Sequence, residues 1–95
     1  MSKREKLRRK LRNNPKDATM QELETLLMRF NFSLERISGS HHIYRYVDEE
    51  QIRKIIVPLH GRKVKRIYVE QAIEVLDQLF PEEETSEENE DGSDE

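Results

Sequence analysis

A glycine-serine turn that runs directly into an alternating strand constrains the fold of this chain more than any other feature. Gly39 and Ser40 suit a tight turn, and residues 43–47 (Ile-Tyr-Arg-Tyr-Val) follow the two-residue period of a half-buried strand. Because successive side chains of a strand point to opposite faces, His41 is predicted to face solvent in a fixed direction. An imidazole held in this way can transfer protons near neutral pH, or it can simply be hydrogen-bonded within the turn.

The residues before the turn predict a helix and a first strand. Thr19 and Glu22 have the spacing of a capping box, in which each side chain bonds the backbone N–H of the other residue. Apolar residues then recur at helical spacing on one face; they are Leu23, Leu26, Leu27 and Phe30. Asn31 suits the left-handed position that often ends a helix. We therefore expect a helix over residues 20–30, followed by a strand over residues 32–38.

The residues after the turn predict two more elements besides the strand that ends at Val47. Polar residues 48–51 form a hairpin connection, and residues 52–59 form a third strand with alternate apolar side chains. A final amphipathic helix is indicated by Val69, Ala72, Ile73, Leu76 and Phe80. The order predicts an α+β fold, in which two helices cover one face of a small three-stranded antiparallel sheet.

Charged segments flank this predicted domain on both sides. Residues 2–13 contain seven Lys or Arg, with Leu7 and Leu11 four residues apart. They predict a short basic helix that either docks on the body or forms a free basic arm. Residues 81–95 contain nine Asp or Glu and no Lys or Arg, so they predict a disordered acidic tail. The chain is thus divided into a basic N-terminal segment (1–18), a folded domain (19–80) and a tail (81–95).

Composition limits the classes of function. The net charge of −3 hides a separation, because residues 1–80 carry 17 Lys or Arg against 11 Asp or Glu, a formal charge of about +6. Such a body is expected to attract a phosphate backbone in a salt-dependent way. The acidic tail can compete with nucleic acid for it, although a solubility appendage is the simpler interpretation. Cysteine is absent, which excludes disulfides and thiolate chemistry. No run is apolar enough to span a membrane, so a cytoplasmic location is expected.

Two short motifs carry a resemblance to a known family. Gly39-Ser40-His41 is followed, after the predicted strands, by Val-Pro-Leu-His-Gly at residues 57–61 and then by the final helix. Over about residues 19–80 the chain resembles the HicA family of toxin-antitoxin proteins. The resemblance implies a fold like that of double-stranded-RNA-binding domains (dsRBD-like), cleavage of mRNA, and a cognate HicB-like antitoxin as partner. It also implies that His41 is catalytic and that His42 does not inherit this role.

RNA cleavage asks for few protein groups, because the 2′-hydroxyl of RNA is a built-in nucleophile. His41 can carry one proton transfer, and His60 can carry a second unless it is merely hydrogen-bonded to a turn. Ser40 is expected to cap its turn or to touch a phosphate. Phosphate contacts are further expected from four basic side chains, which are Arg45, Arg62, Lys63 and Lys65.

The same residues allow several other roles. Tyr44 and Tyr46 can stack on unpaired bases, but core packing is expected for at least one of them. A metal site is not expected, because His41 and His42 point to opposite faces and no Asp or Glu lies within the motif. No cofactor is expected either. The alternatives to a ribonuclease are a non-catalytic RNA-binding module of the same fold and a protein-interaction partner.

Overall fold

The computed structural model describes residues 2–61 and 63–81. Its elements are α1 (Lys3–Asn13), the 3-10 helix η1 (Pro15–Asp17), α2 (Met20–Arg29), β1 (Ser33–Ser38), β2 (His41–Val47), β3 (Ile52–Pro58) and α3 (Arg66–Leu79). The strands form one antiparallel sheet in the order β1-β2-β3. The predicted α+β class and its order of helix, three strands and helix are confirmed. The acidic tail lies outside the described residues from position 82 onward, so its predicted disorder stays a prediction.

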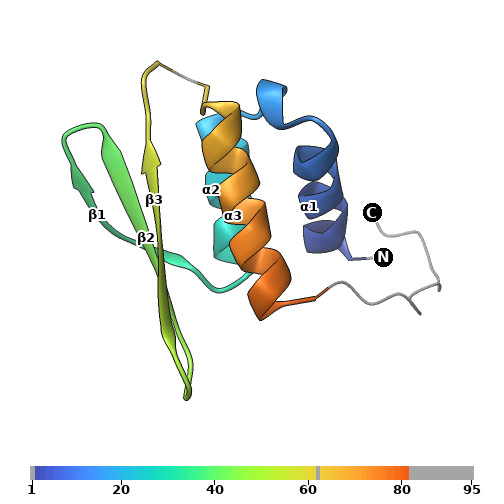
Figure 1. The fold of residues 1–95 in the computed structure, drawn as a ribbon, viewed down its shortest axis with the longest axis vertical. Helices are drawn as coiled ribbons and strands as arrows, with labels where there is room; N and C mark the ends of the chain where they lie inside the picture. Colours follow the sequence, from blue (N-terminus) through green and yellow to red (C-terminus); the bar gives the residue numbers. More distant parts are fainter. Residues whose placement is uncertain (1, 62, 82–95) are drawn as a thin grey trace.

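The elements are arranged in three layers (Figure 1). The sheet forms the first layer, α2 and α3 form a second layer on one of its faces, and α1 lies on the far side of these two helices and contacts both. The core lies between the sheet and the α2–α3 layer and continues beneath α1. The other face of the sheet carries no helix in the described part of the chain.

The α2 helix begins at the predicted capping box. The Thr19 hydroxyl oxygen accepts a hydrogen bond from the Glu22 N–H at 3.1 Å, and a Glu22 carboxylate oxygen accepts one from the Thr19 N–H at 3.1 Å. These contacts satisfy two backbone N–H groups that a helix start leaves unpaired. At the other end, Asn31 adopts the left-handed conformation with φ of 73°, as its sequence position predicted. The chain then turns back into β1.

Strand β2 has one face toward the helices and one face away from them. Tyr44 and Tyr46 lie on the helix side, where the Tyr44 hydroxyl donates to the Glu24 carboxylate of α2 at 2.8 Å. The Tyr46 ring lies 5.5 Å from the Phe80 ring, measured between centroids. The opposite side is called the open face below. It consists of His41, Ile43, Arg45 and Val47 of β2, their β3 partners Pro58, Ile56, Lys54 and Ile52, and the β1 residues Ser33, Arg36 and Ser38 that pair with β2.

Helix α1 is docked on the body, which is one of the two alternatives that its sequence allowed. Leu11 is 1% exposed and belongs to the common core. Some basic residues of α1 contact the body: the Arg4 guanidinium lies 4.7 Å from the centroid of the Phe30 ring, and the exposed Lys10 pairs with Glu22 at 2.8 Å. Arg8 is fully buried. The basic helix is therefore part of the folded unit.

Candidate active site

His41 is the first residue of β2 and is held by strands on both sides. Its backbone pairs with Ser38 of β1 and with Pro58 of β3, and its side chain is exposed. The turn that precedes it requires a left-handed residue, which Gly39 supplies with φ of 61°. The predicted geometry is therefore present: an imidazole in solvent, at a fixed place on the open face.

The turn is also tied to the segment that follows β3. The Leu59 N–H donates to the Ser40 carbonyl oxygen at 2.8 Å. Since His60 comes next in the chain and is exposed, both it and His41 belong to the same end of the sheet. Ser40 adjoins His41 in the chain, and this backbone hydrogen bond brings the segment that carries His60 to the same turn.

Lys63 and Lys65 lie farther along the loop, just before α3. Between them Val64 is 2% exposed, and its N–H donates to the Ala18 carbonyl oxygen at 3.4 Å. Lys63 also forms an isolated bridge with Thr19 at the start of α2. Both lysine side chains are exposed. The segment between β3 and α3, to which they belong, lies at the same end of the molecule as the β1–β2 turn (Figure 1). Arg62, predicted as a phosphate contact, lies outside the described residues.

Arg45 lies on the open face with His41, but not next to it. They are four positions apart in the strand, a distance of about 13 Å along β2. The exposed Arg45 side chain therefore lies in a different part of the open face from the His41 imidazole.

Tyr44 does not have the exposure that base stacking requires. Its side chain is 0% exposed, because β2 turns it under α2. Burial, followed by the hydrogen bond to the Glu24 carboxylate, raises the pKa of its hydroxyl. Of the two uses considered for the tyrosines, core packing is the one found for Tyr44 and, with 9% exposure, for Tyr46. The accessory role considered for Tyr44 is therefore wrong as a contact with RNA.

His42 faces the other way, as strand alternation predicted. It pairs with Ile37 and with the fully buried Val57, on the helix side of the sheet. Its Nδ1 atom is buried and has no hydrogen-bond partner among the described residues. The two adjacent histidines therefore lie in different surroundings, and only His41 belongs to the open face.

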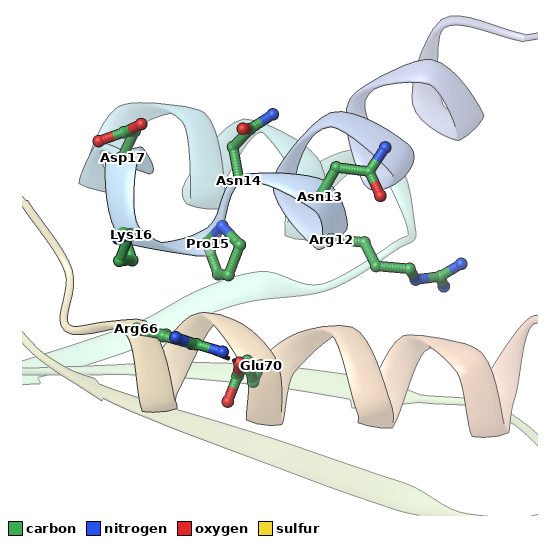
Figure 2. A pocket seen from close by; sticks show the side chains of 8 residues that line it. All are labelled: Arg12, Asn13, Asn14, Pro15, Lys16, Asp17, Arg66 and Glu70. Carbon is green, nitrogen blue, oxygen red and sulfur yellow. Dashed lines mark hydrogen bonds and ion pairs between the residues drawn. The ribbon is translucent and has the colours of Figure 1, made fainter.

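A pocket of about 260 Å³ lies elsewhere, between η1 and the first half of α3 (Figure 2). Its lining comprises Arg12, Asn13, Asn14, Pro15, Lys16, Asp17, Arg66 and Glu70. Two of its cations are already paired, since Arg66 donates to Glu70 at 2.7 Å and Arg12 donates to Asp77. No histidine lines it. Acid-base chemistry is therefore better placed at His41.

Residues 2–61 and 63–81 contain neither a metal-binding cluster nor a membrane-spanning helix. No three His, Cys, Asp or Glu side chains gather there into a group that could hold a metal ion. No helix in the same residues has both the length and the apolar character needed to cross a bilayer.

Sequence reasoning missed two basic residues of the open face. Lys54 lies directly opposite Arg45 on β3, and Arg36 lies opposite Ile43 on β1. The alternation of β3 would place Lys54 on the same face as Ile52 and Ile56. Its alignment with Arg45 depends on the hairpin register, which the polar residues 48–51 do not reveal by composition alone.

The comparison with protein families identifies residues 20–79 as matching a model described as the HicA toxin of bacterial toxin-antitoxin. The match begins at the first residue of α2 and ends at the last residue of α3, so it contains the sheet and His41 but not α1. Comparisons with curated proteins and with solved structures gave no significant match. The chain therefore belongs to the HicA toxin family of bacterial toxin-antitoxin systems.

Proposed function

We propose that this protein is an endoribonuclease that cleaves mRNA without a metal ion and that His41 carries the essential proton transfer. The observation that most supports this proposal is the position of His41, which is exposed and is backbone-paired to Ser38 and to Pro58. Because both neighbouring strands fix its backbone, the imidazole approaches a bound phosphate from a defined direction. Membership of the HicA family supports the same class of reaction.

In the proposed reaction, the 2′-oxygen of a ribose attacks the adjacent phosphorus, and the bond from phosphorus to the 5′-oxygen breaks. Neutral His41 accepts the proton of the 2′-hydroxyl as the new bond forms. The leaving 5′-oxygen needs a proton, and His60 is available for this step because it belongs to the same end of the sheet. The products are a 2′,3′-cyclic phosphate and a 5′-hydroxyl.

The charge that develops on the phosphate needs stabilisation by cations or hydrogen-bond donors. We assign this role to Lys63 and Lys65, whose exposed side chains flank the anchored Val64, and to the hydroxyl of Ser40. Arg62 is proposed as a further contact from its place in the sequence. A cognate HicB-like antitoxin is the proposed protein partner, and it would silence the enzyme by covering His41.

Cleavage of a single-stranded RNA in EDTA tests the proposal. Wild-type protein is expected to cleave, and His41→Ala is expected to lose about 100-fold or more of the rate, because one general acid-base group typically contributes that much. His42→Ala is the matched control, since it removes the neighbouring imidazole from the other face. No variant should cleave an RNA that has a single 2′-deoxy sugar at the cleaved bond, because the attacking 2′-hydroxyl is missing.

Two results would overturn the proposal. One is a wild-type rate of cleavage by the His41→Ala protein. The other is tight RNA binding without cleavage by any variant, which would favour the alternative of a non-catalytic RNA-binding module.

A further inference from the structure

The open face contains two like charges placed directly opposite each other. Arg45 on β2 pairs in register with Lys54 on β3, and both side chains are exposed. Like charges at directly opposed positions of a sheet lower stability. Lys54 has one compensating contact, to the Glu35 carboxylate at 3.4 Å. Within the described part of the chain, Arg45 makes no side-chain hydrogen bond or ion pair. An anion bound between these two cations would relieve the repulsion.

The paired cations share their face with the proposed catalytic residue. Arg45 and His41 lie on the same strand, about 13 Å apart. Arg36 is directed to the same face, because it pairs with Ile43 between them. Basic residues are therefore present on both sides of His41: Lys63 and Lys65 toward α3, and this second group along the sheet.

The surface between His41 and the cation pair is apolar. Ile43 and Ile56 pair there; Ile43 is buried, with 8% exposure, whereas Ile56 is 51% exposed and forms the surface. An isoleucine side chain can contact a ribose or a base but offers no hydrogen bond that would select one base. A strand of RNA that lies on this surface would thus be held mainly through its phosphates.

We propose that the open face is a second part of the RNA-binding surface, where Arg45, Lys54 and Arg36 hold phosphates of a single-stranded RNA on one side of the bond cleaved at His41. The position of this surface beside a cleaved bond rests on the proposed ribonuclease function. The binding of RNA to the open face does not depend on it. It predicts that RNA extends from His41 in two directions, over Lys63 and Lys65 on one side and along β2 on the other. A single strand is favoured because its sugar-phosphate backbone is free to follow the sheet.

The test uses full-length protein and DNA oligonucleotides that contain one ribose, so that only one bond can be cleaved. Each oligonucleotide is lengthened either 5′ or 3′ of that ribose. Lengthening on one side is expected to raise kcat/KM through the contacts of the open face. The Arg45→Gln/Lys54→Gln double variant should lose that gain, so that lengthening the oligonucleotide no longer raises kcat/KM.

A matched double variant controls for net charge. Lys3→Gln/Arg9→Gln also removes two exposed cations, but from α1, in the layer farthest from the sheet (Figure 1). This control variant should keep the full rise in kcat/KM that lengthening the oligonucleotide produces. Thermal melting provides a folding control, because removal of the opposed charges should leave the Arg45→Gln/Lys54→Gln melting temperature unchanged or higher.

Binding measured in the His41→Ala background separates this inference from the proposed function. For single-stranded RNA, each lost phosphate contact should reduce the slope of log Kd against log salt concentration by about 0.7. Glu35→Gln should have the opposite effect on affinity and tighten RNA binding, since it releases Lys54 from its carboxylate partner.

A reduced slope in the Arg45→Gln/Lys54→Gln protein supports the binding path even if no variant cleaves RNA. Equal slopes and equal gains for the two double variants would overturn the path while leaving cleavage at His41 intact. A preference for duplex RNA over a single strand of the same sequence would also overturn it. Weaker binding after Glu35→Gln would count against the role of Lys54.

Discussion

The guanidinium of Arg8 donates a hydrogen bond of 2.7 Å to the carbonyl oxygen of Phe80, joining the first helix of the chain to the end of the last. The same group donates to the Leu76 carbonyl oxygen at 3.4 Å and to the Glu5 carboxylate at 2.7 Å. The last carbonyl groups of a helix have no partner within the helix, and a cation there is also favoured by the helix dipole. Helix α1 thus completes the end of α3, although it lies outside the residues matched by the family.

The first prediction concerns this contact. Arg8→Ala should lower the free energy of unfolding by about 2–3 kcal/mol, because buried hydrogen bonds to a charged group are lost. Arg9→Ala is the control, since it removes an exposed arginine from the same helix and should change stability by less than about 0.5 kcal/mol. Urea denaturation of both variants measures the difference. Equal stability of the two proteins would show that Arg8 does not hold α1 in place.

The docking of α1 marks a limit of prediction from the sequence. The capping box of α2 and the alternation of β2 were predictable because each is local: Thr19 contacts a residue three positions away, and the faces of a strand follow its period. Seven Lys or Arg in residues 2–13 look alike in composition. Helical spacing places Arg8, and not Arg9, beside Leu11, but it does not reveal that Arg8 is fully buried. That burial depends on Phe80, more than 70 positions away. The alignment of Arg45 with Lys54 is likewise a matter of register.

The second prediction tests the buried position of Tyr44. Tyr44→Phe removes the hydroxyl that donates to Glu24 but keeps the ring in the core. The expected cost in stability is about 1 kcal/mol, the usual net value of one hydrogen bond. RNA cleavage and binding should be unchanged, because the ring does not reach solvent. A folded Tyr44→Phe protein with a large loss of cleavage would show that the hydroxyl takes part in the site.

The third prediction concerns pH and the start of α2. The hydrogen bond from the Lys10 ammonium, followed by that from the Thr19 N–H, holds the pKa of Glu22 below its usual value. A carboxyl group whose pKa is lower in the folded state stabilises the protein above its unfolded-state pKa, and this contribution is lost as pH falls through the folded-state pKa. Glu22→Gln can still cap the helix but lacks the charge.

Wild type should therefore be more stable than Glu22→Gln at neutral pH, by at most about 1 kcal/mol, since the partner Lys10 is exposed. Thermal melting from pH 7 down to about pH 3 should show the two proteins converging as the carboxylate is protonated. A constant difference across this range would mean that the amide, rather than the loss of charge, causes the effect.

The last prediction concerns residues 82–95, which lie outside the described part of the chain and contain nine Asp or Glu without any Lys or Arg. Deleting them should leave the melting temperature nearly unchanged, because they contain no apolar side chain to bury and Phe80 remains to accept from Arg8. The same deletion should tighten RNA binding at low salt, since it removes tethered anions that compete for the cations around His41 at effective concentrations up to about millimolar. The difference between full-length and shortened protein should fade above physiological salt, where charges farther apart than about 8 Å are screened. A version in which the nine carboxylates are replaced by amides keeps the length and should bind RNA as the deletion does. Equal low-salt affinity of all three proteins would leave the acidic residues no role in RNA binding, and a solubility appendage would then be the better interpretation.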